Sequence, residues 1–486
     1  MKFVGYEKLS TLKLYTKYSN FAKKMKKWLD TLDVNLIECM YDNKRLEQKP
    51  SLEKDSIPKL EKLQNWFGSV PRFTTIRTNP ATGSSDTIIE IIKTQLQEQA
   101  ASRGRKTLPE VKQDPLLKDC VVVSCWDEQS MNSDRQSQEV IVDVKCGVAI
   151  LRGADLFAPG VIAMSSETTI GSKVSVYADL AQKCLWGRTT PYSDLENKMF
   201  VGNGIALMTR KDIFAGSTKD RKTGRAIEMT DIPSRVSSIS LPPKYGILQN
   251  YPSILCSHVL NPQPGDIVLD MCASPGNKTT HLASLMKHEG TLIALDRSKN
   301  KVEKLDLNCR LQGCDWVRTY AYNSIEAVDK QKISNIDGPP PYPKNSFDKI
   351  LLDAPCSALG QRPHINTSMT AKHINSYPIM QKRLFDTAVS LLKPGGVLVY
   401  STCTILVQEN EGLVEWALNT YPGVIELVRA DPLVGSSGTE WPGSQLTSDQ
   451  RKCLQRFGPD LSQDSIEPHQ SDTIGFFIAK FRKIPT

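Results

Sequence analysis

The chain has 486 residues, of which 40% are hydrophobic and 23% charged, a composition typical of a globular protein with two or three domains. No window approaches the ~18 consecutive apolar residues of a membrane span, and the first residues lack the apolar core of a secretory signal, so we expect a cytoplasmic protein. A formal net charge of +8 suits a polyanionic partner without requiring one.

The cysteines and histidines do not follow metal-binding patterns. There are 12 cysteines and 6 histidines, and no two cysteines form a C-x-x-C pair. The nearest spacings, Cys120/Cys125 and Cys309/Cys314, are not those of zinc sites. We therefore expect reduced thiols, mostly in the core, and no bound metal.

Residues 1–138 are expected to form a mixed, mostly helical N-terminal segment. Phe21, Met25 and Trp28 share one face of a helix, and the lysines around them suit either a solvated face or a nucleic-acid contact. The elements expected further along are a β segment over 71–79, a helix over 88–100, a strand over 120–125 and a flexible polar link over 126–138.

Short β runs separated by glycines fill residues 139–231 and predict a small β-barrel module. The expected runs are 140–144, 148–151, 161–164, 173–177 and 200–206. The stretches Lys145–Gly160, Gly171–Tyr177 and Gly202–Gly204 resemble the PUA domain, a pseudobarrel of RNA-modifying enzymes. The resemblance implies RNA contacts, by phosphate pairing and base stacking, from Arg152, Phe157, Lys183 and Arg188. The alternative is that Arg152 is a structural surface charge and Phe157 a core residue.

Residues 240–486 predict a doubly wound, Rossmann-like α/β domain after a Ser/Pro-containing connector at 232–251. Strands and helices alternate, which indicates a parallel sheet covered on both faces. The expected strands are 266–272, 291–296, 317–323, 347–353 and 397–403, with helices over 278–288, 299–311, 371–392 and 408–419. The final apolar run, 473–481, is expected to add a strand at the edge of the sheet.

The first turn of this domain has the features of a nucleoside-cofactor site. The stretch Leu269–Lys278 closes a strand with a tight turn at Gly276, and Asp296 ends the next strand, where a carboxylate can hold ribose hydroxyls. A dehydrogenase normally has G-x-G-x-x-G at this turn to bind a diphosphate. The single glycine here favours a cofactor without a diphosphate, such as S-adenosylmethionine.

Two cysteines follow later strands of the same sheet. Cys356 comes three residues after Asp353, and Cys403 ends another apolar strand. Because the carboxyl ends of parallel strands meet at one edge of a sheet, both thiols can face one pocket. Taken alone, the first stretch could also be an ordinary turn, stiffened by Pro355, with Cys356 as a small buried hydrophobe.

The stretches Asp270–Thr280, Asp353–Ser357 and Ser401–Thr404 together resemble the Nop/Sun family of RNA cytosine-5 methyltransferases, over roughly residues 240–481. Combined with a PUA-like insertion, they resemble its tRNA-modifying members. The resemblance implies a monomeric tRNA methyltransferase that acts on an acceptor-stem cytosine beside the discriminator base, with the PUA-like module holding the CCA end. An rRNA or mRNA methyltransferase and a non-catalytic RNA-binding protein stay open.

The family also implies roles for individual residues. Cys403 would add to carbon 6 of cytosine, and Cys356 would assist loss of the C5 proton or product release. Asp353 would bind the N3/amino edge of the base, and Lys278 would help to hold it. The residues implied in binding S-adenosylmethionine are Cys272, Ala273, Ser274, Pro275, Gly276, Asn277, Lys278, Asp296, Arg297, Lys301, Asn323 and Asp353.

Three positions depart from the family pattern. Asn277 replaces a glycine and can still take the left-handed conformation that a glycine would, so the turn is expected to survive. Ala358 replaces another glycine, at little cost unless the position needs positive φ. Asn323 replaces an aspartate that faces the cofactor, so this change is expected to affect cofactor affinity more than any other property.

Overall fold

The structure, a computed structural model, describes residues 62–63, 65–127, 134–189, 198–215, 223–331, 335–365, 369–459 and 467–485. The helix expected around Phe21, Met25 and Trp28 lies outside these residues. Within them, no helix is long and apolar enough to cross a membrane.

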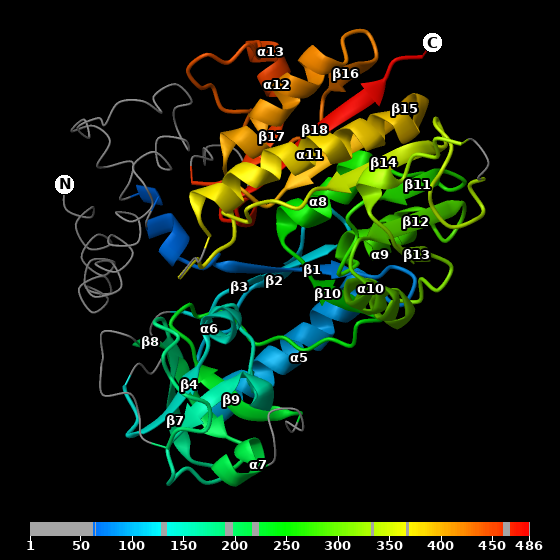
Figure 1. Ribbon diagram of the computed structural model, residues 1–486. Coiled ribbons are helices and arrows are strands. Elements are labelled where there is room, and N and C mark those ends of the chain that lie inside the picture. Colours follow the sequence, from blue (N-terminus) through cyan, green and yellow to red (C-terminus); the bar gives the residue numbers. More distant parts are fainter. Residues whose placement is uncertain are drawn as a thin grey trace, which may run out of the picture.

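The C-terminal half of the chain builds the largest sheet (Figure 1). Its strands, in spatial order, are β13 (Arg318–Ala321), β12 (Thr291–Asp296), β11 (Ile267–Asp270), β14 (Phe347–Asp353), β15 (Leu392–Thr402), β18 (Phe476–Lys483) and β16 (Ile425–Val428), and β17 (Gln455–Phe457) also pairs with β18. The strands from β13 to β15 are parallel, whereas β18 is antiparallel to β15 and to β16.

Helices cover both faces of this sheet. Successive residues of β14 point in opposite directions: Ile350 and Leu352 join one apolar core, and Leu351 joins the other. The first core holds α11 (Ala371–Leu391) and α12 (Glu411–Thr420), and the second holds α8 (Tyr251–Leu260), α9 (Asn277–Leu285) and α10 (Lys299–Leu311). The expected doubly wound α/β domain is confirmed.

Two details of this domain differ from expectation. β18 is not an edge strand, because the unpredicted strand β16 pairs with its outer side. The connector ends in the unpredicted helix α8, which begins at Tyr251 and is buried along most of its length. A helix that is buried on all sides does not alternate apolar and polar residues with the helical period. The sequence of α8 therefore did not identify it as a helix.

The N-terminal segment combines helix and strand. Its antiparallel sheet has the order β10 (Gly246–Leu248), β1 (Phe73–Thr78), β3 (Cys120–Ser124) and β2 (Val111–Gln113). α5 (Ser85–Arg103) packs its buried residues Ile88, Ile92 and Leu96 against this sheet. β10 lies within the expected connector and pairs with β1, so this sheet is completed only after the chain has passed through the β module.

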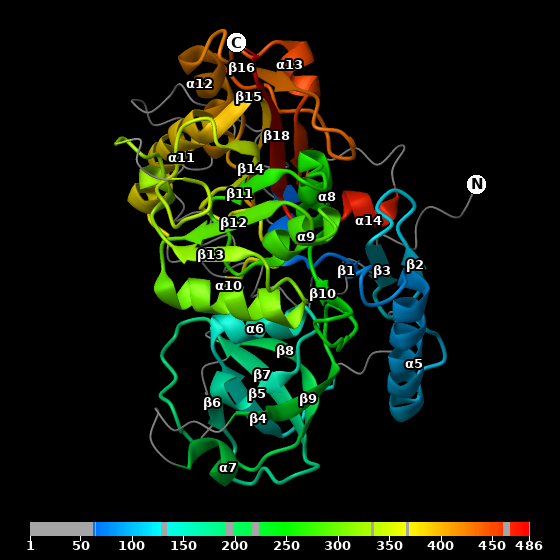
Figure 2. The same cartoon turned by 90° about the vertical axis from the view of Figure 1, so that its right-hand side faces the viewer.

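The β module has an apolar core of its own and lies beside the N-terminal sheet (Figure 2). Its sheet has the order β5 (Leu156–Phe157), β9 (Arg225–Asp231), β8 (Lys198–Ala206), β7 (Lys173–Asp179), β4 (Gln138–Val142) and β6 (Val161–Met164), with α6 (Val144–Leu151) and α7 (Arg210–Phe214) packed on it.

The strand expected over 148–151 is wrong, because these residues belong to α6. The Asp143 side chain caps this helix by accepting a 2.6 Å hydrogen bond from the Cys146 N–H. Gly147 lets the helix approach the sheet, since a Cβ at this position would lie 2.6 Å from the Ala178 Cβ. The apolar run at 148–151 is compatible with either a helix or a strand. The Asp143 cap and the close packing at Gly147 favour the helix.

Two aspartates at the ends of the β2–β3 turn join the N-terminal sheet to the C-terminal α/β domain. Asp114 Oδ2 lies 2.6 Å from His469 Nε2. Asp119 lies 2.8 Å from His258 Nε2 and 2.7 Å from His281 Nε2. These contacts connect elements far apart in the sequence and are buried or partly buried.

We expect this junction to make the free energy of unfolding depend on pH. Burial lowers the pKa of His281 to about 4, despite the nearby Asp119 carboxylate. In the unfolded chain the pKa of His281 is about 6.5. The contribution of neutral His281 to the free energy of unfolding is therefore complete above that pH and is lost as pH falls towards its pKa in the folded protein. Urea denaturation between pH 7.5 and 5 should show a decline of up to ~1.4 kcal/mol per pH unit from this group.

His281→Gln should reduce that decline, because glutamine can still reach Asp119 but does not titrate. The exposed His373, changed to glutamine in the same way, provides the matched control and should leave the decline unchanged. An undiminished pH dependence in His281→Gln would assign it to other groups.

Candidate active site

The carboxyl ends of β14 and β15 bring the two expected thiols together. The parallel register pairs Asp353 with Ser401, so the chain leaves both strands at the same level. Cys356 and Cys403 follow these positions, and their Sγ atoms lie 3.4 Å apart. Each side chain is only partly buried. A polar substrate can therefore approach two sulfurs in one place.

A lysine–carboxylate pair lies at the same strand ends. Lys278, in the first turn of α9, donates a 2.7 Å hydrogen bond from Nζ to Asp353 Oδ2. Ser401 Oγ donates to the other carboxylate oxygen at 2.6 Å. Burial alone would lower the pKa of Lys278, but the Asp353 carboxylate raises it, so the ammonium group is retained. The site thus combines thiols with a fixed positive charge and an oriented carboxylate.

The two thiols differ in acidity. The hydrogen bond from Cys356 lowers the pKa of Cys403, and Lys278 acts in the same direction. The same interaction and burial raise the pKa of Cys356. Cys403 is therefore the sulfur that the surroundings favour as a thiolate, the form in which cysteine is a nucleophile.

Buried polar groups behind the thiols fix the two loops, and the sequence had not indicated them. Glu409, which is fully buried, accepts from the Ser357 N–H at 3.0 Å and from Gln381 Nε2 at 2.8 Å. Ser357 Oγ and Thr404 Oγ1 lie 2.7 Å apart. Glu409 and Gln381 fall in ordinary helical stretches, so no local pattern could have placed them beside the thiols.

Most of the expected cofactor residues lie just after the ends of β11, β12 and β13, whereas Lys278 and Lys301 lie in the first turns of α9 and α10 and Asp353 ends β14. Gly276 has a φ of +106°, and a Cβ there would lie 2.8 Å from Leu305 Cδ1, so the tight turn into α9 requires glycine. Ser274 Oγ donates to the Lys301 carbonyl at 3.0 Å and holds the turn against α10. Asp296 Oδ1 accepts from the Ser298 N–H at 3.2 Å, and its other oxygen can accept a ribose hydroxyl.

The three departures from the family pattern have different outcomes. The turn at Asn277 survives as expected, although Asn277 itself begins the helix and the left-handed residue is Gly276. Ala358 does have positive φ, +55°, a conformation that costs alanine about 1 kcal/mol relative to glycine. The Asn323 side chain accepts from the Ile325 N–H at 3.4 Å and donates to Glu326 at 3.0 Å, so it caps a short helical turn.

The four residues expected to contact RNA lie on the β module at different places. Phe157 is 54% exposed, so the alternative of a core position is wrong. Lys183 and Arg188 are exposed in the segment after β7. Arg152 instead reaches the loop that follows Cys356, where its Nε donates to the Arg362 carbonyl at 2.8 Å.

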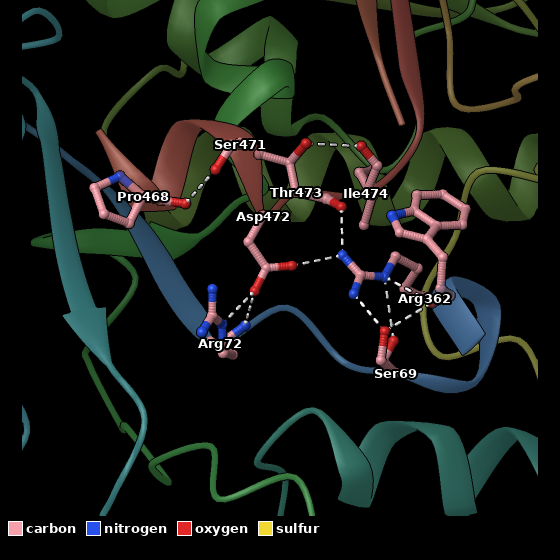
Figure 3. Close-up of polar contacts among 9 residues, drawn as sticks. Ser69, Arg72, Arg362, Pro468, Ser471, Asp472, Thr473 and Ile474 are labelled. Atoms are coloured by element: carbon pink, nitrogen blue, oxygen red, sulfur yellow. Dashed lines mark hydrogen bonds and ion pairs between the residues drawn. The ribbon is translucent and has the colours of Figure 1, made fainter. Parts of the chain in front are cut away.

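A cavity of about 280 Å³ opens where the three parts of the chain meet. Arg152 from the β module and Asn277 from the turn into α9 line it. Arg362, from the loop that follows Cys356 (residues 357–365, here called the catalytic loop), lines it as well. The buried guanidinium of Arg362 joins this loop to the N-terminal segment and to the residues before β18 (Figure 3). Lys278, Asp353 and the two thiols are not among its lining residues, so the cavity lies beside the turn into α9 and the loop after Cys356 and not at the reactive groups themselves.

One group of possible metal ligands occurs among the residues that the structure describes. Asp119, His258 and His281 bring three ligand atoms within 4.8 Å of one another. Their contacts of 2.7 and 2.8 Å are ordinary hydrogen-bond lengths, which account for the arrangement without an ion. The absence of a metal stays a prediction.

Comparison with known proteins decides the family. Residues 257–482 match the 16S rRNA methyltransferase RsmB/F family. Human tRNA (cytosine(72)-C(5))-methyltransferase NSUN6 is 40% identical over 442 residues, which span 87% of this chain and 91% of the human protein. The chain belongs to the Nop/Sun family of RNA (cytosine-5) methyltransferases. Mouse NSUN6 is 41% identical over 89% of this Nop/Sun chain and 92% of its own length.

Other relatives agree with this assignment. An rRNA (cytosine-C(5))-methyltransferase, NOP2C of Arabidopsis thaliana, is 29% identical over 84% of this chain and 85% of its own. The crystal structure of NSun6 from Pyrococcus horikoshii with SFG, an S-adenosylmethionine analogue, has a TM-score of 0.65 and 28% identity and covers 88% of this chain and 95% of its own. This Nop/Sun protein is an S-adenosylmethionine-dependent RNA (cytosine-5) methyltransferase, as the sequence predicted.

Proposed function

We propose that this enzyme methylates carbon 5 of an acceptor-stem cytosine in tRNA, beside the discriminator base, and that the β module holds the CCA end. The observation that carries the proposal is the similarity, over nearly the full length, to two mammalian tRNA (cytosine(72)-C(5))-methyltransferases. We further propose that the enzyme is monomeric and acts in the cytoplasm. The paired thiols at the ends of β14 and β15 supply the nucleophile that this activity needs.

The reaction begins with Cys403. Carbon 5 of cytosine is a poor nucleophile until a group adds to carbon 6, and a thiolate is the side chain best suited to that addition. The Cys403 sulfur forms a bond to carbon 6, and the electron pair moves through the ring towards N3. A proton reaches N3 through Asp353 from the Lys278 ammonium group, which is hydrogen-bonded to this carboxylate and becomes neutral, so that no net charge builds up in the ring.

The second half of the reaction uses Cys356. Bound S-adenosylmethionine supplies the methyl group, which carbon 5 accepts. The C5 proton then leaves to water, N3 returns its proton through Asp353 to Lys278, and the electron pair of the C5–H bond re-forms the C5–C6 double bond as the Cys403–C6 bond breaks, which releases 5-methylcytosine and the Cys403 thiolate. Cys356 lies 3.4 Å from Cys403 and assists this elimination. The target base has to leave its stack to reach both sulfurs, as expected of a cytosine near a helix end that can fray.

RNA binding is divided between the module and the active site. Phe157 offers an exposed ring for stacking, and Lys183 and Arg188 offer charges for phosphates. Two N–H groups of Arg152 donate to the catalytic loop, and its other N–H groups can donate to a phosphate. The cofactor is held by the turn around Gly276, by Asp296 and by the side chains near them.

We expect S-adenosylhomocysteine to raise the melting temperature of the protein and NAD to leave it unchanged. A ligand that binds only the folded state stabilises it by about 2.7 kcal/mol at one hundred times its Kd. The single glycine of the first turn fits a cofactor without a diphosphate, which is why NAD should fail. Differential scanning fluorimetry with each ligand at millimolar concentration checks this. Asp296→Ala should weaken the shift, and equal shifts with both ligands would contradict the assignment.

The function is tested by methyl transfer from labelled S-adenosylmethionine to total tRNA, ribosomal RNA and poly(A) RNA, followed by mapping of the modified base. The proposal requires label in tRNA at the acceptor-stem cytosine beside the discriminator base. Removal of the CCA end should greatly reduce the transfer. Methylation of ribosomal RNA alone would favour the activity named for the Arabidopsis relative.

A further inference from the structure

Two consecutive residues, Glu409 and Asn410, lie directly before α12 and are fully buried. The hydroxyl of Tyr400, in β15, donates a 2.6 Å hydrogen bond to the Glu409 carbonyl, and the Asn410 N–H donates to the Val407 carbonyl at 3.1 Å. These bonds hold the two residues behind the ends of β14 and β15. Because both side chains are enclosed, they act on the site through the groups that they contact.

The Asn410 side chain holds the chain on both sides of Cys403. Its Oδ1 accepts a 2.6 Å hydrogen bond from Thr402 Oγ1, and its Nδ2 donates to the Thr404 carbonyl at 3.0 Å. An amide accepts at one end and donates at the other, so one asparagine satisfies both neighbours. An ionised aspartate has the same shape but only acceptors, and it would lose the contact with Thr404. Asn410 thus fixes the place where β15 delivers this thiol.

Glu409 holds the chain around Cys356 together with Gln381 of α11. Glu409 Oε2 accepts from the Ser357 N–H at 3.0 Å and from Gln381 Nε2 at 2.8 Å. The same Gln381 nitrogen donates to the Pro355 carbonyl at 3.0 Å. The residue before this thiol and the residue after it are therefore both held by buried side chains.

We propose that Glu409 and Asn410 are positioning residues that set the separation of the two catalytic sulfurs. Because they are neighbours in the chain, the peptide bond between them links the backbone around one thiol to the backbone around the other. Ser357 Oγ and Thr404 Oγ1, 2.7 Å apart, make a second link between the same two loops. The 3.4 Å between the sulfurs then follows from these buried contacts. The proposal rests on the proposed function only in the roles given to the two sulfurs.

The first test uses the free full-length protein, without RNA or cofactor. Phenylarsine oxide bonds two sulfurs through one arsenic atom, and its oxygen leaves as water with the two thiol protons. Protection of Cys356 and Cys403 from iodoacetamide, measured by peptide mass spectrometry at increasing arsenical concentration, gives the apparent affinity. The second arsenic–sulfur bond forms readily only if the sulfurs are already close, so we expect this affinity to fall about tenfold in Asn410→Ala and in Glu409→Ala.

Conservative variants and a matched control separate positioning from stability. Glu409→Gln keeps an oxygen for both donors and should retain the affinity, whereas Asn410→Asp should lose it as Asn410→Ala does. Asn203, in the β module, is a buried amide that accepts from Ser175 Oγ at 2.8 Å and donates to the Asp134 carbonyl at 2.9 Å. Asn203→Ala removes an equivalent pair of contacts and should leave the affinity unchanged. Melting curves identify any variant that fails to fold.

The second test separates the two residues in catalysis. Asn410→Ala displaces the nucleophile, so both turnover and the covalent enzyme–RNA adduct should fall, by about a hundredfold for a shift near 1 Å. Glu409→Ala disturbs Cys356, which assists elimination, so turnover should fall while the Cys403 adduct accumulates. A denaturing gel of enzyme incubated with tRNA and S-adenosylmethionine shows the difference. A merely structural defect would lower turnover without accumulating adduct.

An unchanged arsenical affinity in folded Asn410→Ala or Glu409→Ala would overturn the role of that residue. An equal loss in Asn203→Ala would overturn the proposal as a whole. Both results are obtained without RNA, so they are distinct from a failure of the proposed substrate. Weakened arsenical binding together with no adduct in Glu409→Ala would support the positioning role and contradict the roles proposed for the two sulfurs.

Discussion

Changing Cys403 to alanine should abolish both methyl transfer and any covalent enzyme–RNA adduct, with a loss of turnover of at least about a thousandfold. Without the addition to carbon 6, carbon 5 is never activated. Cys356→Ala should also stop turnover, but the Cys403 adduct should form and persist because its elimination is impaired. A denaturing gel of enzyme incubated with tRNA and S-adenosylmethionine separates the two outcomes.

The thiol pair adds a finer expectation. The Cys356 hydrogen bond lowers the pKa of Cys403, so Cys356→Ala removes a group that favours the thiolate. The adduct in this variant should therefore accumulate more slowly at pH 7 than at pH 9. Cys453→Ala, at a partly buried thiol remote from the strand ends, is the control and should turn over normally. An adduct trapped in Cys403→Ala and absent in Cys356→Ala would show that the two roles are reversed.

The sequence predicts those site residues that lie at or just after the carboxyl ends of strands. Asp353, Cys356 and Cys403 each end or follow an apolar run, and parallel pairing alone is enough to bring them to one edge. The helices and strands of this domain were predictable for the same reason, because apolar runs alternate with amphipathic ones. The exceptions include α8, whose continuous burial leaves no period to detect, and the short strand β16.

The contacts between parts of the chain could not be predicted in this way. Gln361 meets Arg152 across 209 residues of sequence, and His469 meets Asp114 across 355. Such pairs are set by how one folded unit docks on another, and a single sequence carries no local period for that. The same limit applies to β10, a short strand whose partner β1 lies far upstream.

The largest effect on stability is expected at Arg362, the centre of the contacts in Figure 3. Its guanidinium group, only 5% exposed, donates to Asp472 Oδ1 and to the Thr473 carbonyl, each at 2.8 Å. It also donates to the Trp66 carbonyl at 3.0 Å and to Ser69. One side chain thus joins the N-terminal segment, the catalytic loop and the residues before β18.

Arg362→Ala should lower the free energy of unfolding by about 3–5 kcal/mol, the usual cost of removing one partner of a buried ion pair. The Thr473 carbonyl would also lose this buried donor, whereas the Trp66 carbonyl would keep its hydrogen bonds from Ser69. Arg362→Lys should recover only part of the loss, because one ammonium group cannot reproduce a planar fork that donates in several directions. Urea denaturation of the purified variants measures both changes.

Arg72 provides a matched control, because it binds the same carboxylate from the solvent side. Its Nε lies 3.1 Å from Asp472 Oδ2, but its side chain is 62% exposed. Arg72→Ala should therefore cost less than about 1 kcal/mol, as expected for an exposed ion pair. Equal losses in Arg72→Ala and Arg362→Ala would contradict the argument from burial. A large loss confined to Arg362→Ala, accompanied by slower methyl transfer in the folded variant, would show that the buried arginine supports the catalytic loop as well as the fold.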